Sequence, residues 1–415
     1  MKNMLLTLTA ILSFTLSFAQ QRETYSRVKV ILDAKEQTMV RLSQTGVAVD
    51  HGDYRKNQYF ISDFSESELK AIKDAGFTTE VLIEDVKKHY REQSGQTENT
   101  DQRKTSSVPC DTAQMPLINI PPHFHTGSYA GGHFTYNEML EKLDSMQLLY
   151  PNLISARQQV GSFLTHEGRP IYWVRVSNNP TVSQPAKPQV LYTALHHARE
   201  PGSLTATIFY LWHLLDNYNT DPQVKAIIDN TELYFIPCVN PDGYNYNLVN
   251  DPFGGGMWRK NRRNNLNGTY GVDLNRNYGY LWGYDNLGSS NSSASDVYRG
   301  PSGFSEPETQ AIKWFTEQHN FSLALNYHTF NNELLSPYGH VQVAYPVDSL
   351  EYSAFSVQLT KYNFYRYGTC YQCLGYVSNG GSDDWMYAEQ ATKNKIYAFT
   401  PEIGEVSSGF QFSSW

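Results

Sequence analysis

The hydrophobic positions of the first ninety or so residues alternate over short stretches. Some of these stretches have the period of two that is typical of strands, and others have helical spacing. Ser65 and Glu68 also have the spacing of a capping box at the start of a helix. The pattern predicts a compact α+β unit over residues 20–90, in which strands are expected at 25–32, 58–61 and 79–83 and helices at 35–45 and 65–75.

From residue 116 onward the predicted elements become longer and more regular. An amphipathic helix is predicted at 136–149, and an apolar strand at 189–195 precedes an apolar helix at 203–218. Alternating strands and helices predict an α/β fold in which a largely parallel sheet carries helices on both faces. In such sheets ligands bind beyond the carboxyl ends of the strands. Further strands are expected at 232–239, 322–327 and 395–399, and a further helix at 306–318.

Two segments fit neither pattern. Lys2 precedes a largely apolar run that ends in Ser17, Phe18 and Ala19, which predicts a secretory signal peptide over residues 1–19. No later segment is apolar over the roughly 20 residues that a membrane helix needs, so we expect a secreted, extracellular or periplasmic protein without a membrane span. Residues 91–115 are polar and aperiodic and contain Arg103 and Lys104, which predicts a protease-accessible linker before a large domain at 116–415.

Composition and charge narrow the class of protein. The 415 residues are 40% hydrophobic and 18% charged, as in an ordinary globular chain. Lys and Arg number 33 and Asp and Glu 41, and the resulting net charge of −8 argues against nucleic acid or an anionic membrane as a partner. Of the four cysteines, Cys370 and Cys373 are interpreted as a local disulfide or as two free thiols.

The strongest chemical signal follows the apolar strand at 189–195. His197 and Glu200 have a His-x-x-Glu spacing that lets two side chains of one tight turn face a single zinc ion. His328 follows another predicted strand, and a catalytic zinc needs such a third ligand beside an open position. The carboxyl ends of parallel strands meet at one edge of a sheet, so the three residues together predict a zinc site. His196 lacks a carboxylate at the same spacing and is the poorer candidate.

Several separate motifs from about residue 125 onward resemble the zinc metallocarboxypeptidases, the family of the pancreatic carboxypeptidases A and B and their bacterial relatives. The resemblance implies one zinc ion per catalytic domain and the removal of single residues from the C-termini of peptides or proteins. It also implies a three-layer α/β/α fold with a central mixed, mostly parallel sheet, preceded by a small α+β pro-domain. The motifs are His197-Ala-Arg-Glu200, the loop Asn240-Pro-Asp-Gly-Tyr244, Trp258-Arg-Lys260, Asp273-Leu-Asn-Arg-Asn277 and residues 298–308.

The resemblance assigns chemical roles to individual residues. His197, Glu200 and His328 correspond to the zinc ligands. Glu402 corresponds to the general base and Arg259 to the residue that stabilises the oxyanion of the tetrahedral intermediate. Asp273 corresponds to the carboxylate that orients a ligand imidazole.

The substrate-binding positions are also implied by the resemblance. Arg276, assisted by Asn275, corresponds to the clamp for the terminal carboxylate, a task that suits a planar guanidinium. Tyr376 corresponds to a mobile tyrosine that covers the bound terminal residue, and Arg199 to an outer substrate contact. Asp383 lies where the family has the floor of the pocket for the terminal side chain, which is apolar in carboxypeptidase A and acidic in carboxypeptidase B. We therefore expect a preference for C-terminal Lys or Arg.

Three further expectations concern regulation, extent and alternatives. The 20–90 unit corresponds in size and element order to the family's inhibitory pro-domain, which implies an activating protease at 91–115. A further helix is expected after the strand that ends at Glu402, so the sequence is expected to lack the end of the domain. A cell-wall peptidase acting on diaminopimelate-containing peptides would share the zinc site. An inactive binding domain would ordinarily have lost a ligand or the base, and this chain has all of them.

Overall fold

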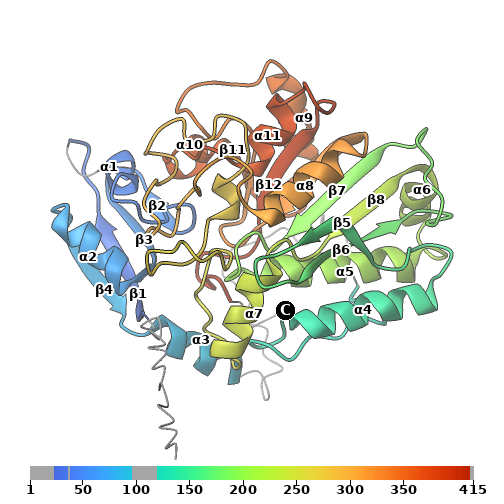
Figure 1. Ribbon diagram of the computed structural model, residues 1–415, viewed down its shortest axis with the longest axis horizontal. Coiled ribbons are helices and arrows are strands. Elements are labelled where there is room, and N and C mark those ends of the chain that lie inside the picture. The colour runs from blue at the N-terminus through green and yellow to red at the C-terminus, as the bar shows by residue number, and fades with distance from the viewer. Residues whose placement is uncertain (1–22, 36–37, 96–118, 412–415) are drawn as a thin grey trace, which may run out of the picture.

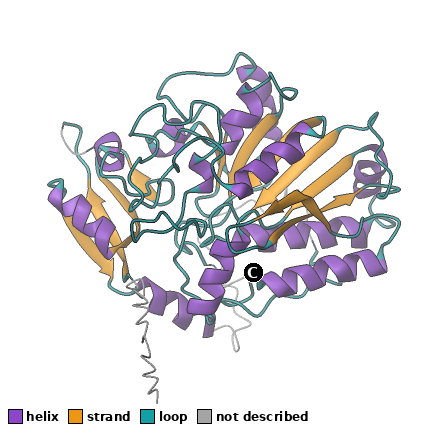
Figure 2. Cartoon of the chain, viewed as in Figure 1, coloured by secondary structure: helices purple, strands orange, loops and turns teal. Residues whose placement is uncertain are grey.

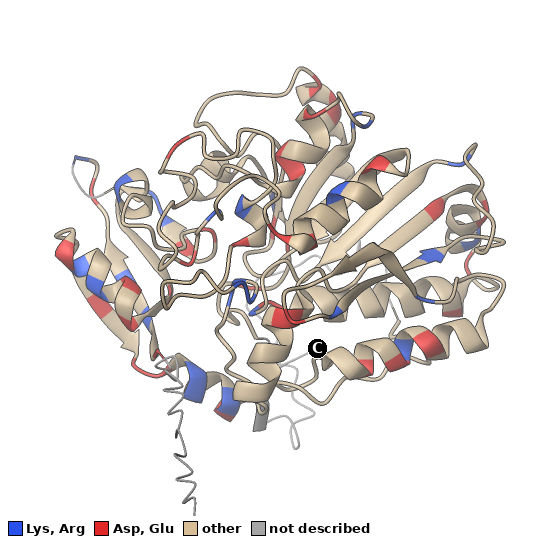
Figure 3. Ribbon diagram, viewed as in Figure 1, with Lys and Arg blue, Asp and Glu red and all other residues tan. Residues whose placement is uncertain are grey.

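The computed structural model describes residues 23–35, 38–95 and 119–411, which form an N-terminal unit and a larger C-terminal domain (Figure 1). The predicted signal peptide, most of the predicted linker and Cys110 lie outside these ranges. Within them, no helix combines the length and the apolar character that crossing a membrane requires. Charged residues of both signs are interspersed along the described elements of both parts (Figure 3).

The N-terminal unit is a four-stranded antiparallel sheet, in the order β2-β3-β1-β4 over the described residues. Ser65 caps the second helix through a capping box with Glu68, as the sequence predicts. Val28 and Val30 share one buried cluster with Leu42 and Ile72, which joins the sheet to both helices. The elements are β1 (Tyr25–Ile31), α1 (Met39–Ser43), β2 (Asp53–Arg55), β3 (Tyr59–Ser65), α2 (Glu66–Asp74) and β4 (Thr79–Ile83).

Helix α3 (Val86–Gly95) corrects the predicted start of the linker at residue 91. Val86 and Tyr90 are four residues apart, so both lie on one face of the helix, and both are buried in a cluster with Phe410. The Tyr90 hydroxyl also donates to Asp63 Oδ2 at 2.6 Å. Because these two residues anchor the first turns, the polar residues that follow continue the helix to Gly95.

The C-terminal domain is built on a mixed sheet with eight strands among the described residues, in the order β11-β10-β12-β9-β7-β8-β6-β5. The central strands β12, β9, β7 and β8 are parallel, whereas β5, β6 and β10 make antiparallel pairs. The strands are β5 (Gln158–Leu164), β6 (Pro170–Val176), β7 (Gln189–Ala194), β8 (Glu232–Ile236), β9 (Phe321–Tyr327), β10 (Glu333–Leu335), β11 (Arg366–Gly368) and β12 (Tyr397–Glu402).

Helices cover both faces of this sheet (Figure 2). Tyr192 and Leu191 are neighbours on β7 and belong to two different buried clusters, because successive side chains of a strand point to opposite faces. The cluster of Tyr192 includes residues of α4 (Tyr136–Leu149), α5 (Pro201–Asn217), α6 (Pro222–Asn230), α7 (Pro241–Asn250) and α9 (Ser349–Leu359). The cluster of Leu191 includes residues of α8 (Pro307–Glu317) and α11 (Ser382–Ala388). The expected three-layer α/β/α arrangement is thus confirmed.

Two local expectations are settled by the structure. The segment expected as a loop after a central strand begins helix α7 instead, with Asn240 as its N-cap and Pro241 in its first turn. Pro fits there because the first backbone N–H groups of a helix need no intrahelical acceptor. Cys370 and Cys373, on the short helix α10 (Cys370–Leu374), are buried free thiols, so the disulfide interpretation is wrong.

The N-terminal unit packs against loops at one end of the larger sheet. Figure 1 shows the unit (blue) beside the long loops (yellow to orange) of the C-terminal domain. The cluster that contains Val28 and Val30 continues across this contact to Leu335, Leu374 and Tyr376. The end of the sheet where ligands are expected therefore faces the N-terminal unit.

Candidate metal centre

His197, Glu200 and His328 converge at the carboxyl edge of the parallel strands. His197 and Glu200 lie in the turn between β7 and α5, and His328 directly follows β9. His197 Nδ1 lies 2.7 Å from Glu200 Oε1, and His328 Nδ1 lies 2.9 Å from Glu200 Oε2. All three side chains are buried. The three predicted ligands thus place their donor atoms around one point.

Asp273 holds the far side of the His197 ring. Its Oδ1 lies 3.1 Å from His197 Nε2, whereas Glu200 faces Nδ1. A carboxylate at this place favours the proton on Nε2, which leaves the lone pair of Nδ1 directed at the shared point. Burial alone would raise the pKa of Asp273, but the charges of Arg259, His197 and Arg276 hold it well below its usual range.

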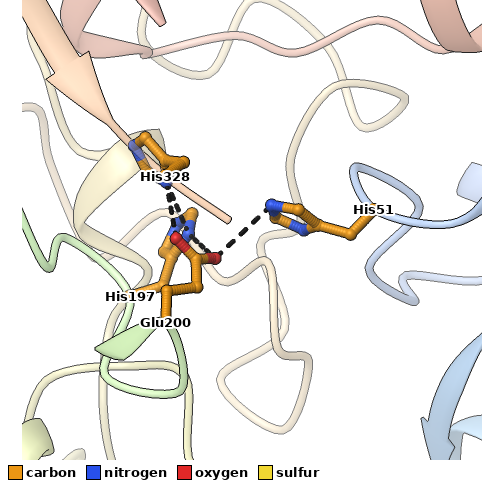
Figure 4. Close-up of side chains that lie close together, drawn as sticks. All are labelled: His51, His197, Glu200 and His328. Atoms are coloured by element: carbon orange, nitrogen blue, oxygen red, sulfur yellow. Dashed lines mark hydrogen bonds and ion pairs between the residues drawn. The ribbon is translucent and has the colours of Figure 1, made fainter. Parts of the chain in front are cut away.

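A fourth buried side chain, which the sequence analysis missed, completes the group. His51 lies on the loop between α1 and β2 of the N-terminal unit, and its Nε2 lies 3.4 Å from Glu200 Oε1 (Figure 4). The ligand atoms of His51, His197, Glu200 and His328 all lie within 4.8 Å of one another. In the sequence, the one sign of His51 is that it and Asp50 directly follow a short apolar run. Such a pattern is too common to identify a metal ligand.

The donor set fits zinc. Imidazole nitrogens and a carboxylate are among the donors that zinc prefers, and the ring nitrogen of His197 that faces away from the centre has the carboxylate partner typical of a ligand histidine. His196 is outside the group: its Nε2 lies 2.8 Å from the Tyr278 hydroxyl, in agreement with its interpretation as a poorer candidate.

Glu402 ends β12 beside the metal centre. Its Oε2 lies 3.0 Å from His51 Nε2, and its backbone forms a bridge with His328. Burial alone would lower the pKa of His51, but the carboxylates of Glu402, Asp50 and Glu200 raise it to about 10. The predicted base is therefore within reach of the centre, and in this structure it contacts the N-terminal unit.

Arg259 and Arg276 hold one carboxylate between them. Arg259 donates from Nη1 to Asp50 Oδ1 at 3.2 Å, and Arg276 donates from Nη2 to Asp50 Oδ2 at 3.1 Å. Arg259 also donates from Nη2 to Asp273 Oδ2 at 2.9 Å. Burial opposes the charge of Asp50, but Arg259, His51 and Arg276 hold its pKa well below the usual range. The arginine predicted to stabilise the oxyanion and the arginine predicted to bind the substrate carboxylate thus both bind an anion of the chain itself.

The remaining predicted residues differ in how close they lie to this group. Asn275 Nδ2 lies 3.5 Å from His328 Nε2, and its Oδ1 accepts from Ser382 N at 2.9 Å. Tyr376 is buried against the N-terminal unit. Arg199 lies apart from Asp50: its guanidinium stacks on the Phe410 ring at 4.3 Å and pairs with Asp296 at 3.5 Å.

Asp383 is buried in the first turn of α11. Its Oδ1 accepts from the backbone N–H of Asp384 at 2.9 Å, and Thr400 Oγ1 lies 3.5 Å from its Oδ2. Burial and the adjacent Asp384 raise the pKa of Asp383 to about 7. No ion pair of the described residues includes this carboxyl group, so its charge has no cationic partner within this part of the chain.

Comparison with known proteins agrees with this geometry. Residues 139–414 match the family described as zinc carboxypeptidase. The chain is 32% identical over 257 residues to zinc carboxypeptidase A 1 of Drosophila melanogaster, which covers 60% of this chain and 57% of that protein. It is 30% identical over 284 residues to carboxypeptidase B of Helicoverpa zea, which covers 65% and 62%. The matched part therefore spans about three fifths of each relative.

The fold agrees as well. The crystal structure of carboxypeptidase A from Helicoverpa armigera aligns with a TM-score of 0.70 at 24% identity and covers 92% of this chain and 88% of that one. A buried histidine and glutamate group at the carboxyl edge of such a sheet defines a zinc-binding α/β protein. With the sequence match, the chain belongs to the zinc carboxypeptidase family, which confirms the resemblance found in its motifs.

Proposed function

We propose that the protein is a secreted zinc carboxypeptidase that removes single C-terminal residues and prefers Lys or Arg. The observation that carries this proposal is the carboxylate of Asp50, held by Arg259 and Arg276 beside the metal centre. Asp50 stands in for the terminal carboxylate of a substrate. An exopeptidase needs such an anion site next to its metal, because the clamp sets which bond reaches the centre.

The residues of the chain divide the chemical tasks. When bound by His197, Glu200 and His328, zinc would supply Lewis-acid polarisation of the scissile carbonyl and lower the pKa of water. Glu402 takes the proton of the attacking water and delivers it to the leaving amine. Arg259 stabilises the negative charge that develops on the carbonyl oxygen, and removing one such fixed donor typically costs about 2.7–4 kcal/mol.

Recognition of the terminal residue is assigned to the neighbouring side chains. Arg276 and Asn275 bind the carboxylate, Tyr376 covers the bound residue, and Asp383 receives its side chain. A terminal Lys or Arg of the substrate would be the cationic partner that Asp383 lacks, and the two would form a charge-assisted hydrogen bond. The support for this part is the buried, unpaired carboxyl group of Asp383. Arg199, which stacks on Phe410, would contribute indirectly.

We further infer a latent precursor. The signal peptide at residues 1–19 would direct secretion, and a protease that cleaves within the linker would free the domain that starts near residue 116. The contact of Asp50 and His51 with the predicted substrate-binding and catalytic residues supports inhibition by the N-terminal unit. Catalysis then requires that this unit leave.

One assay tests the proposal against its alternatives. The secreted protein is assayed before and after trypsin cleavage of the linker, with peptides that end in Arg, Phe or diaminopimelate and with a chelator control. We expect activity only after cleavage, highest on Arg and lost with the chelator. Turnover of diaminopimelate peptides alone would select a cell-wall peptidase. Bound zinc without hydrolysis of any peptide would select an inactive binding domain.

A further inference from the structure

The loop of the N-terminal unit that enters the metal centre is fully buried. Residues 47–52 are all buried, and Asp50 and His51 retain exposures of 4% and 2%. These two adjacent side chains make separate contacts, because Asp50 binds the two arginines while His51 faces Glu200 and Glu402. Asp50 thus occupies the anion site while His51 occupies the metal centre.

The His51 ring has the same environment as the ligand ring of His197. His51 Nδ1 lies 2.9 Å from Asp50 Oδ1, just as His197 Nε2 lies 3.1 Å from Asp273 Oδ1. In both cases a carboxylate holds the nitrogen that faces away from the centre, and the opposite nitrogen faces Glu200. A carboxylate partner on the far nitrogen is the usual mark of a metal-bound histidine.

Contacts on every side hold this ring in place. The ring centroids of Phe330 and Phe410 lie 5.8 Å and 5.3 Å from that of His51. The Ser62 hydroxyl donates to the His51 carbonyl at 2.6 Å. Gly52 follows with φ +154°, and a Cβ there would lie 2.3 Å from the Ile61 carbonyl oxygen, so the loop requires glycine at this position. The N-terminal unit thus restricts the backbone of this loop, while Phe330 and Phe410 of the C-terminal domain hold the His51 side chain.

We propose that His51 is the fourth zinc ligand of the uncleaved chain and binds the metal through Nε2. The proposal rests on the proposed function and specifies how the centre is kept latent. Structural zinc sites have four protein ligands, whereas catalytic ones have three and an open position. With His51 bound, the centre is of the closed kind, and departure of the N-terminal unit converts it to the open kind. Asp50 acts as a positioning residue, because it orients the His51 ring and is itself held by Arg259 and Arg276.

The same distances fit one competing arrangement, in which a cationic His51 pairs with Glu402 and makes no bond to the metal. The two arrangements differ in the number of protein ligands around the ion, because water fills the open position when His51 is not bound. The visible absorption of cobalt(II) responds to the kind and number of its ligands, and the rate of zinc release to a chelator reports how strongly the ligands hold. Neither measurement requires catalytic activity.

The experiment compares the uncleaved chain with His51→Ala and His51→Gln, each prepared with zinc and with cobalt. The matched control is His89→Ala, since His89 lies in the same unit on α3, where its ring contacts Gln93 at 2.9 Å. We expect both His51 variants to change the cobalt spectrum and to release zinc at least about tenfold faster, by analogy with the losses seen for ligand-supporting residues. The control should retain the spectrum and the release rate of the unsubstituted chain.

Unchanged cobalt spectra and release rates in folded His51→Ala and His51→Gln would overturn the proposal and select the ion pair with Glu402. Circular dichroism establishes folding, and His51→Gln provides a variant of similar volume in case the alanine variant does not fold. A chain that binds no zinc before cleavage would overturn it as well. By contrast, cleaved enzyme that holds zinc but hydrolyses no peptide refutes the proposed function alone, because the spectral comparison of the uncleaved chains still decides the role of His51.

Discussion

His51 Nε2 lies 3.0 Å from Glu402 Oε2, although His51 belongs to the N-terminal unit and Glu402 ends the last described strand of the C-terminal domain. In this arrangement the His51 ring occupies the side of Glu402 Oε2 on which an attacking water would have to lie. The contact therefore links the position of the N-terminal unit to the proposed catalytic base, and it explains why activity is expected only after that unit has moved.

Glu402→Gln is expected to lower kcat of the linker-cleaved enzyme by about 10²–10⁴-fold, the usual contribution of a general acid–base group. The zinc content should stay unchanged, because Glu402 is not among the three expected ligands. Steady-state kinetics together with metal analysis checks both parts. Retained turnover would show that another group accepts the proton.

Asp383→Asn is expected to lower kcat/KM for substrates that end in Arg by roughly 100-fold, the effect of losing one partner of a buried charge pair. Hydrolysis of substrates that end in Phe should change little and serves as the internal control. Kinetics with matched blocked dipeptides measures the ratio. Equal losses on both substrates would indicate a structural role for Asp383.

The preference for Arg over Phe is expected to increase as the pH rises through about 7. Burial and Asp384 raise the pKa of Asp383 to about 7, so below this pH the carboxyl group is neutral and cannot pair with a cation. The ratio of the two kcat/KM values between pH 6 and pH 8 tests this. In Asp383→Asn the ratio should be flat over the same interval, and a slope in that variant would assign the effect to another group.

Asp273→Asn is expected to weaken zinc binding by about 10–100-fold, because the His197 ring loses the carboxylate that orients it. The matched control is Asp216→Asn, since Asp216 holds His123 by a comparable 2.7 Å contact outside the metal centre. Competition with a chelator of known affinity measures the zinc dissociation constant. Equal effects of the two substitutions would contradict the assignment of Asp273.

Removal of zinc is expected to lower the affinity of the N-terminal unit for the cleaved domain by at least about tenfold. If bound zinc holds His51, the binding of zinc and the binding of the N-terminal unit strengthen each other by the same factor. Size-exclusion chromatography of the nicked chain with and without a chelator measures retention of the unit. His51→Ala should abolish this dependence on zinc, whereas His89→Ala should keep it. A dependence that persists in His51→Ala would have to arise elsewhere in the interface.

Glu308 is buried in the first turn of α8, and Glu308→Gln is expected to stabilise the protein at pH 8 more than at pH 5. Burial and Glu306 raise the pKa of Glu308 to about 8, so the folded chain keeps a proton that the unfolded chain has released at about pH 4.3. Stability of the unsubstituted protein therefore falls as the pH rises between these values, and the variant lacks this loss, which amounts to about 2–4 kcal/mol. Urea denaturation at both pH values measures the difference, and an equal effect at the two would contradict it.

Local patterns were sufficient for the long elements and for the strands that carry His197 and His328. The predicted helix 136–149 coincides with α4, and the strands that precede His197 and His328 end within one residue of their predicted positions. Such elements are long and apolar, so their periodicity shows which face is buried. The strands β10 and β11 were not predicted because three residues are too few to show a period, and β5 was not predicted because it is an edge strand whose side chains are largely exposed.

By itself, the sequence determined the motifs that identify the family and the three expected zinc ligands, which follow from local spacing at strand ends. The expected role of Glu402 came from the resemblance to the family. Only the tertiary structure decided that Asp50 and His51 lie among them. That arrangement depends on how the N-terminal unit docks on the C-terminal domain. Local hydrophobic periodicity indicates that a surface is buried, but it does not indicate which other surface covers it. The contact of this loop with the metal centre therefore became visible only in the fold.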